Sequence, residues 1–151
     1  MSRIRIATAA DAPRIGELAH ALWPDGSVDA HSDEMAAIVR GEPVTTLPLA
    51  VFVAEDAGAI VGFIEVGLRS HADGCDPSRA VGFVEGWYVE PAFQRRAIGR
   101  ALMAAAETWS REHGARELGS DTWLDSAGSQ HAHEALGFEV VDRCVHYRKS
   151  L

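Results

Sequence analysis

The sequence predicts an α+β fold with a mixed sheet, formed by one domain that spans residues 1–151. Short apolar runs rich in Val, Ile and Phe, bounded by Gly, Pro or Asp, are typical of strands. Longer runs with apolar residues three and four positions apart are typical of amphipathic helices. The length of 151 residues is near the commonest domain size, and no linker or repeat interrupts the sequence.

Six segments have the composition of strands. They are residues 3–7, 49–54, 59–66, 81–89, 116–123 and 138–147. The second and third are joined by residues 55–58, a short Asp- and Gly-containing sequence that is typical of a hairpin turn. A polar loop, residues 71–79, precedes the fourth strand. The last segment is expected to form one strand or a pair of strands.

Between these strands the sequence indicates four helices. They run from a cap at Thr8 or Asp11 to residue 22, from Ser32 to residue 40, over residues 98–113, and from a cap at Asp125 or Ser126 to residue 136. The third helix has the clearest pattern, because it has a continuous apolar face and a glycine directly after its end. The apolar face consists of Ile98, Leu102, Ala105 and Trp109, and the glycine is Gly114.

The charge of the chain restricts its partners. There are 22 acidic and 14 basic residues, which gives a formal net charge of −8 and an isoelectric point near 5.3. Proteins that bind nucleic acid need a broad basic face, so we expect no nucleic-acid partner. A cationic small molecule or a basic peptide suits this charge. The alternative is that the negative charge serves solubility alone.

The composition also indicates where the protein acts. No apolar run is long enough to cross a bilayer, and the first residues alternate like a strand instead of forming a signal peptide, so we expect no membrane partner. Cys75 and Cys144 are far apart and too few for a disulfide framework. We therefore expect a reduced, cytoplasmic protein.

A cluster of arginines interrupts this acidic chain. Arg95, Arg96 and Arg100 lie where the strand at residues 81–89 is expected to lead into a helix. The first backbone N–H groups of a helix lack partners and carry partial positive charge, and arginines add charge-assisted hydrogen bonds. Gly99 allows a ligand atom to approach the backbone closely. The segment predicts a diphosphate site. The alternative is a solvated helix start whose arginines pair with surface acids.

Two segments resemble a known family. Residues 94–99, QRRAIG, resemble the Gln/Arg-x-x-Gly-x-Gly/Ala signature of the acyl-CoA-dependent N-acetyltransferases of the GNAT superfamily. Residues 126–138 resemble the family's Asn-x-x-Ala-x-x-x-Tyr-x-x-x-Gly-Phe helix, with Ser126 in place of Asn and His133 in place of Tyr. Ala97 replaces the first glycine, where a positive φ would strain alanine. The resemblance implies a mostly antiparallel sheet, split to hold acetyl-CoA and flanked by about four helices.

Four shorter segments resemble a subfamily, the aminoglycoside 6′-N-acetyltransferases. They are residues 22–25 (LWPD), 85–89 (EGWYV), 120–122 (SDT) and 129–139 (SQHAHEALGFE). The loop at residues 69–79 is shorter than theirs, and Ala72 falls where they carry an aromatic residue. The resemblance implies acetyl transfer from acetyl-CoA to the 6′-amine of an aminoglycoside by direct attack in a ternary complex. It also implies a homodimer, in which residues 140–147 could pair across the interface.

The resemblance assigns a set of residues to acetyl-CoA, the expected cosubstrate. They are Tyr88, Val89, Gln94, Arg95, Arg96, Ala97, Ile98, Gly99, Arg100, Ala101, Ser126, Ser129 and His133. A backbone N–H near Val89 would polarise the thioester carbonyl. His133 is the candidate general acid for the departing thiolate. The alternative is a histidine that packs against the cofactor as a spacer.

The resemblance also places residues around the acceptor amine. They are Trp23, Glu85, Asp121 and Asp142. Carboxylates at the mouth of the split would attract a polycation, and Glu85 is the candidate catalytic base. Trp23 would offer an apolar face to a sugar ring. The alternatives are a core tryptophan, a strand-end charge at Glu85 and a turn cap at Asp121.

The sequence leaves other functions open. The same fold could acetylate another polyamine or a protein amine, or could bind acetyl-CoA without catalysis. A metal site is not expected, because His131 and His133 are two positions apart on a helix and face different ways. The two cysteines are expected to take no part in the chemistry, and no Gly-x-Ser-x-Gly nucleophile motif is present.

Overall fold

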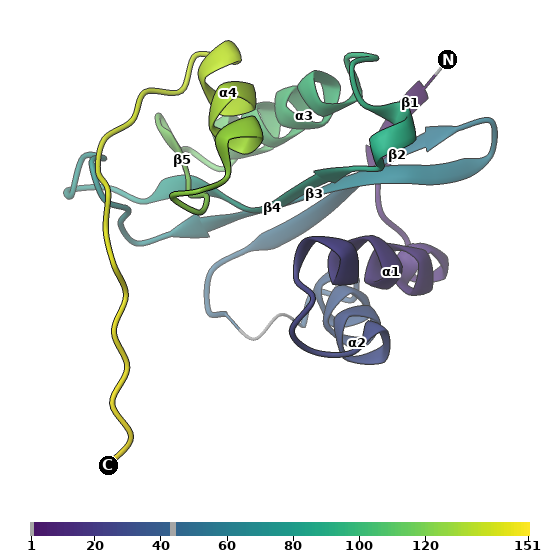
Figure 1. Cartoon of the computed structure of the whole chain (residues 1–151), viewed down its shortest axis with the longest axis horizontal. Helices are drawn as coiled ribbons and strands as arrows, with labels where there is room; N and C mark the ends of the chain where they lie inside the picture. The colour runs from purple at the N-terminus through teal and green to yellow at the C-terminus, as the bar shows by residue number, and fades with distance from the viewer. Residues whose placement is uncertain (1, 43–44) are drawn as a thin grey trace.

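The computed structural model describes residues 2–42 and 45–151, and within them one sheet of five strands has the order β1-β2-β3-β4-β5 (Figure 1). The strands are β1 Ser2–Ile6, β2 Leu49–Asp56, β3 Ala59–Arg69, β4 Val81–Val89 and β5 Leu118–Ser120. β1 to β4 pair antiparallel, and β5 runs parallel to β4. The predicted α+β class with a mostly antiparallel mixed sheet is confirmed.

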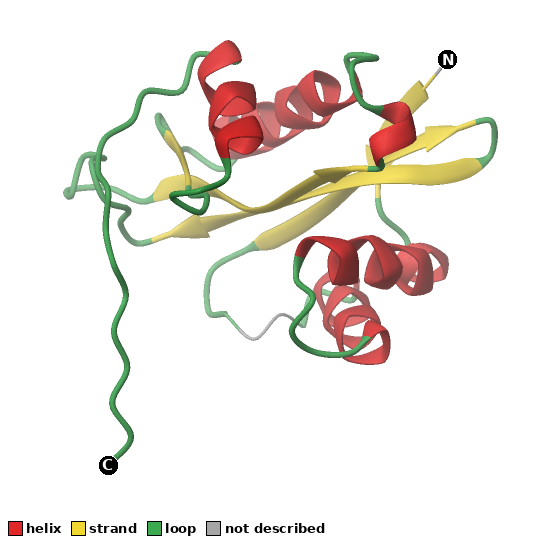
Figure 2. Ribbon diagram, viewed as in Figure 1, coloured by secondary structure: helices red, strands yellow, loops and turns green. Residues whose placement is uncertain are grey.

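Helices cover both faces of this sheet (Figure 2). The described α-helices are α1 Ala12–Leu22, α2 Val28–Val39, α3 Ile98–Glu112 and α4 Ala127–Ala135, with short 3-10 turns η1 Ala9–Asp11 and η2 Pro91–Phe93. One core cluster joins α1 and α2 to one face of the sheet, and a second joins α3 to the other. Alternating side chains of the strands supply both clusters, as the period of two requires.

The start of α2 differs from the prediction. Ser27 is its N-cap and accepts a hydrogen bond from the amide of Ala30 (3.0 Å), so the helix begins four residues before Ser32. The hydroxyl of Ser32 instead bonds the carbonyl of Val28 within the helix (2.9 Å). Ser32 also packs where a side chain at Gly16 would lie, so α1 and α2 approach closely. The prediction that Ser32 opens the helix was wrong.

The strands also depart from their predicted lengths. The hairpin is confirmed, because β2 and β3 are joined by Ala57 and Gly58, which both have positive φ. β3 extends to Arg69, three residues further than predicted. β5 is only three residues long, whereas a strand over residues 116–123 was expected.

The short β5 leaves the sheet split. β4 pairs with β5 only over Gly82–Val84, so the edge of β4 from Glu85 onward has no neighbouring strand among the described residues. The pairing of β4 with β3 shifts register between Glu65 and Val66, opposite Glu85. Such a bulge turns the local side chains and often lies beside a functional site. The predicted split is therefore present, and a bulge lies at its base.

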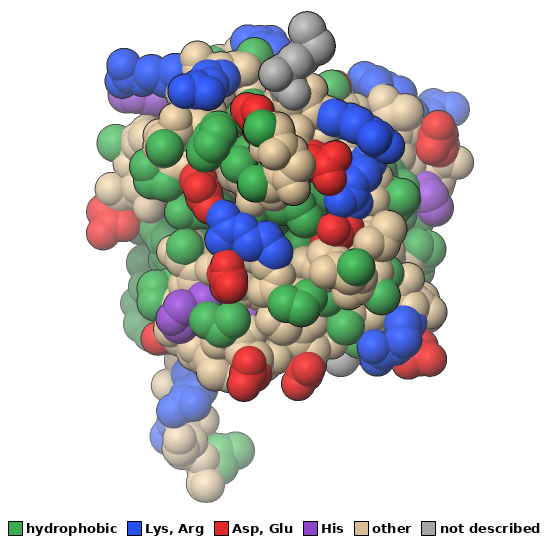
Figure 3. Space-filling model, turned by 90° about the vertical axis from the view of Figure 1, so that its right-hand side faces the viewer, with side chains coloured by type: hydrophobic (Ala, Val, Ile, Leu, Met, Phe, Trp, Pro, Cys, Tyr) green, Lys and Arg blue, Asp and Glu red, His purple; other side chains and the backbone are tan. Residues whose placement is uncertain are grey.

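The predicted final strand is absent. Residues 138–151 contain no helix or strand. Phe138 packs against the core and Val141 lies against Gly74, and the chain then extends away from the domain (Figure 1; it projects below the body in Figure 3). Val145 and Tyr147 are 66% and 93% exposed. A strand needs a neighbour to bond its backbone, and the described chain offers this segment none. Within the described residues, no helix combines the length and apolarity needed to cross a membrane.

Candidate active site

The connection from β4 to α3 has the geometry of an anion-binding site. Ala97 is the N-cap of α3 and has φ 62°, so alanine adopts the left-handed conformation expected at the family's glycine position. Arg95 also has a positive φ, of 64°. Within the described chain, no acceptor bonds the amides of residues 98–100, because the first α3 bond runs from Ala101 to Ala97 (3.0 Å). These amides can therefore bind an anion.

The three arginines around this helix start are available for a ligand. Arg95, Arg96 and Arg100 are exposed, and no carboxylate of the described residues forms an ion pair with any of them. This contradicts the alternative in which surface acids neutralise them. Gln94 instead bonds the backbone of β4, since its side-chain amide donates to the carbonyl of Val89 (3.0 Å). Ile98 is buried in the core and anchors the helix start.

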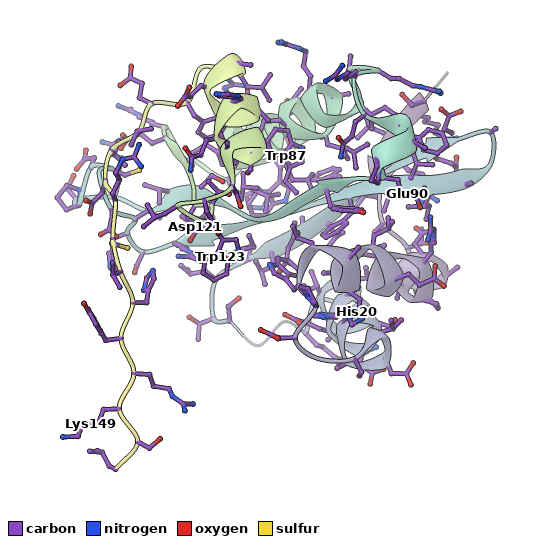
Figure 4. All side chains as sticks on the ribbon, in the orientation of Figure 1. His20, Trp87, Glu90, Asp121, Trp123 and Lys149 are labelled. Carbon is purple, nitrogen blue, oxygen red and sulfur yellow. The ribbon has the colours of Figure 1, made fainter. Side chains whose placement is uncertain are left out.

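Gly99 has a packing role that the sequence did not indicate. A side chain at this position would lie 3.2 Å from the ring of Trp87, whose indole N–H donates to the Gly99 carbonyl (3.2 Å). The glycine therefore lets the indole of β4 approach the helix backbone closely. Trp87 thereby links β4 to the start of α3 (Trp87 is labelled in Figure 4).

The free edge of β4 presents backbone groups to the split. Glu90 donates its amide to Val61 of β3 (2.9 Å), so alternation along the strand turns the amide of Val89 toward the split. Tyr88 packs with the core cluster of α1 and α2, so its side chain lies on the opposite face from α3. The predicted use of the Val89 amide is thus geometrically possible.

His133 bridges the two strands that flank the split. Its ring meets Trp87 of β4 edge-on, with centroids 5.2 Å apart, and its Nε2 lies 2.7 Å from the hydroxyl of Ser120 on β5. Its Nδ1 lies 2.7 Å from the carbonyl oxygen of Ser129. A carbonyl can only accept, so Nδ1 carries a proton and donates to Ser129, and a second hydrogen bond joins Nε2 to the hydroxyl of Ser120. Ser126 occupies the N-cap position of α4, but its side chain makes no capping hydrogen bond.

Glu85 lies at the base of the split and is paired with a cation. Arg69 donates two hydrogen bonds to it, of 2.8 and 2.6 Å, and stacks 3.6 Å above the ring of Phe83. The hydrogen bonds that Arg69 donates to Glu85 raise the pKa of Arg69, and the charges of Glu85 and Asp121 add to this effect. Glu85 and Asp121 therefore act on one cation (Asp121 is labelled in Figure 4). The sequence did not identify Arg69.

Two of the predicted substrate-binding residues, Trp23 and Asp142, lie in different parts of the molecule. Trp23 follows α1 and contacts Phe63 edge-on, with centroids 6.2 Å apart, and its ring covers Gly86 of β4. It is thus half-buried at the rim of the α1–α2 core, near the base of the split. Asp142 lies on the extended C-terminal segment and bonds only the neighbouring amide of Arg143 (2.7 Å). The structure does not bring Asp142 to the split of its own chain.

A cavity of about 350 Å³ adjoins Glu85 on the face of the sheet that α2 covers. Its charged lining consists of Glu34, Glu65, Arg69 and Glu85. Glu65 is 4% exposed, and burial raises its pKa to about 8, with Glu34 and Glu85 adding to the shift. Sequence reasoning missed Glu34 and Glu65. For Glu65, the sequence feature that could have indicated a functional residue was its single charge inside the apolar run of residues 59–66.

The cysteines show no features of a nucleophile. Cys75 lies in the loop before β4, and burial raises the pKa of its thiol. Cys144 is exposed on the C-terminal segment. Throughout the described chain, no three His, Cys, Asp or Glu side chains are grouped as a metal site would require.

A split sheet beside a helix start with free amides and unpaired arginines defines a class of acyltransferase, the one that binds an acyl-CoA thioester. The model of the acetyltransferase (GNAT) family matches residues 14–138, so this chain belongs to that family. It is 42% identical to an aminoglycoside N(6′)-acetyltransferase type 1 of Stenotrophomonas maltophilia, over 98% of this chain and 93% of the relative. It is 41% identical to the Klebsiella aerogenes enzyme of that name, over 86% and 84%.

Solved structures agree with this membership. AAC(6′)-Iy in complex with the bisubstrate analogue CoA-S-monomethyl-acetylneamine superposes with a TM-score of 0.88 at 34% identity, covering 100% of this chain and 99% of that one. The aminoglycoside 6′-N-acetyltransferase AAC(6′)-Ih of Acinetobacter baumannii gives a TM-score of 0.86 at 25% identity, with coverage of 100% and 99%.

Proposed function

We propose that this protein is an aminoglycoside 6′-N-acetyltransferase that uses acetyl-CoA as acetyl donor. One observation carries the proposal: the open edge of β4 lies between an anion-binding helix start and a group of carboxylates. The first suits a diphosphate, and the second suits a polycationic amine. The named relatives support the choice of acceptor, because they match nearly the whole chain.

The chain's own residues have distinct tasks in this reaction. The amine nitrogen attacks the thioester carbonyl, so a C–N bond forms, the C–S bond breaks and a thiolate leaves. Acetyl-CoA, when bound, supplies the acetyl group as an activated thioester. The helix start and its arginines hold the diphosphate, and the Val89 amide donates to the carbonyl oxygen on which negative charge develops. Positioning supplies most of the rate, so no covalent enzyme intermediate is needed.

Proton transfer falls to groups on the two sides of the split. The acceptor must lose a proton, and Glu85 is the candidate base, directly or through water. The thiolate must gain one, and the candidate acid is His133, which donates from Nε2 when that nitrogen is protonated and lies 2.7 Å from the hydroxyl of Ser120. Trp23 and Asp121 are proposed to contact the sugar that bears the amine, at the rim of the split.

We further propose a cytoplasmic homodimer. Exposed apolar residues concentrate after β5, where Trp123 and Leu124 are followed by the apolar side chains of the extended C-terminal segment. A second copy of the chain would cover them and would supply the hydrogen-bond partner that the segment lacks. Asp142 could then reach the partner's substrate. Two free cysteines suit a reducing compartment.

An acceptor panel tests the assigned activity. Release of CoA thiol is measured with kanamycin, tobramycin, spermidine and a peptide with a free N-terminus. We expect rapid release with the two aminoglycosides and little with the others, since only the aminoglycosides combine several ammonium groups with a sugar ring. Preference for spermidine or the peptide would assign the chain to another amine within the same family.

A further inference from the structure

Glu65 is a buried carboxyl group that the reaction described above does not use. It lies on β3, is 4% exposed, and lines the 350 Å³ cavity next to Glu85. Within the described residues, no donor bonds it and no cation pairs with it. Asp11, also buried, shows the usual arrangement, because Arg5 and Thr8 together donate hydrogen bonds to it. Among the described residues, Glu65 has no such structural partner.

The charged side chains around Glu65 do not explain why a carboxyl group is buried at this position either. Glu34 on α2 and Glu85 on β4 face the same cavity, and both repel a negative charge on Glu65. Arg69 on β3 is the cation of this cavity, but its Nε and Nη2 donate to Glu85 and not to Glu65. Three acidic side chains and one basic side chain therefore line the cavity. Its excess of acidic groups and its volume can accommodate a further cation.

We propose that Glu65 is a substrate-binding residue which, together with Glu34, binds a second ammonium group of the substrate inside this cavity. The inference rests on the proposed function, because the acceptor amine would lie at Glu85 and the second ammonium beyond it. An aminoglycoside carries several ammonium groups on adjacent rings, so one molecule can occupy both positions. The cavity then selects polyamines over monoamines.

Binding at this position has a consequence for protons. Burial and the neighbouring acids, Glu34 and Glu85, keep Glu65 mostly protonated in the empty protein at pH 7, because its pKa is about 8. A cation that enters the cavity favours the carboxylate, so Glu65 releases a proton as the substrate binds. Arg69, the other charge that faces the cavity, stays protonated throughout.

Steady-state kinetics with two acceptors isolate this contact. Neamine carries several amines, whereas methyl 6-amino-6-deoxyglucoside has one. We expect Glu65→Gln to lower kcat/KM for neamine about tenfold more than it lowers kcat/KM for the monoamine. Glu34→Gln should also lower kcat/KM for neamine. Because Glu34 is exposed on α2, this variant does not depend on how the core tolerates a buried substitution. Glu112→Gln, the same change at the far end of α3, is the control.

Calorimetry in two buffers of different ionisation enthalpy counts the protons released when neamine binds. At pH 7 the wild-type protein should release up to about one proton more than Glu65→Gln. This difference should vanish above pH 9, where Glu65 is ionised in the empty protein as well. Equal proton counts together with an unchanged kcat/KM for neamine would overturn the proposal. If the wild-type protein acetylates neither acceptor, the proposed function fails, and the calorimetric comparison still decides whether Glu65 binds the cation.

Discussion

At the scale of single residues, Ala97 stands where a glycine is usual and accepts a strained backbone. Its φ of 62° costs an L-residue about 1–2 kcal/mol, and the strain is retained at the turn that opens the diphosphate site. The strain suits a function in which the turn aims free amides at a ligand. The sequence predicted this position correctly, because the departure from the family's glycine was visible in the motif.

Replacing Ala97 by glycine should therefore stabilise the protein. We expect Ala97→Gly to raise the free energy of unfolding by about 1 kcal/mol in urea denaturation, because glycine adopts positive φ freely. The matched control is Ala104→Gly in the exposed middle of α3, which should lower it by about 1 kcal/mol. A loss of stability in both variants would contradict the assigned strain.

Other site residues were hidden from the sequence by their context. Ser120 and Trp87 hold His133 across the split, but the link depends on a parallel pairing of only three residues that no periodicity reveals. Glu65 lies within an apolar run that reads as a buried strand. Its functional character follows only from the cavity and from the bulge beside it, which are tertiary features.

At the scale of elements, the connection between β1 and α1 depends on one buried carboxylate. Asp11 accepts two hydrogen bonds from Arg5 on β1 (2.7 and 2.9 Å) and bonds the amide and hydroxyl of Thr8 (2.7 and 3.0 Å). The hydrogen bonds from Arg5, with those from Thr8, lower the pKa of Asp11 from 3.8 to about 2. Asp11 thereby fixes the chain where the strand enters the first helix.

Neutralising Asp11 should weaken this junction in a pH-dependent way. Its pKa is lower in the folded than in the unfolded protein, so its contribution is complete above pH 4 and is lost as the pH falls toward 2. We expect Asp11→Asn to cost about 2 kcal/mol at pH 7, with the gap to wild type narrowing below pH 4. Asp29→Asn, exposed in the first turn of α2, is the control for urea titrations. A gap independent of pH would contradict the ion pair's role.

The elements also show where sequence patterns reach their limit. Three of the four helix starts were placed to within two residues, because caps and breakers are local signals. The start of α2 was misplaced because Ser27 lies in a Gly- and Ser-rich break, where several residues could cap. The final segment alternates like a strand, yet alternation does not supply the neighbouring strand that pairing needs.

At the scale of the whole molecule, the C-terminal segment remains unexplained within one chain. Tyr147 is 93% exposed at the end of an apolar series that leaves the domain. We expect the protein to sediment as a dimer of its 16.2 kDa chain. The double variant Val145→Asp/Tyr147→Asp should sediment as a folded monomer, because the charges oppose burial at the interface. Ser150→Asp in the same segment should remain a dimer. A monomeric wild type would contradict the proposed assembly.

The proposed acetyl transfer reaches one particular amine of the acceptor, the 6′-amine. Neomycin and paromomycin differ at the 6′ carbon, which carries an amine in the first and a hydroxyl in the second. The direct test is the rate of CoA thiol release with each, with the mass of the product. We expect rapid release and one added acetyl group with neomycin, and release at the background rate with paromomycin. Equal rates with both acceptors would contradict the claim.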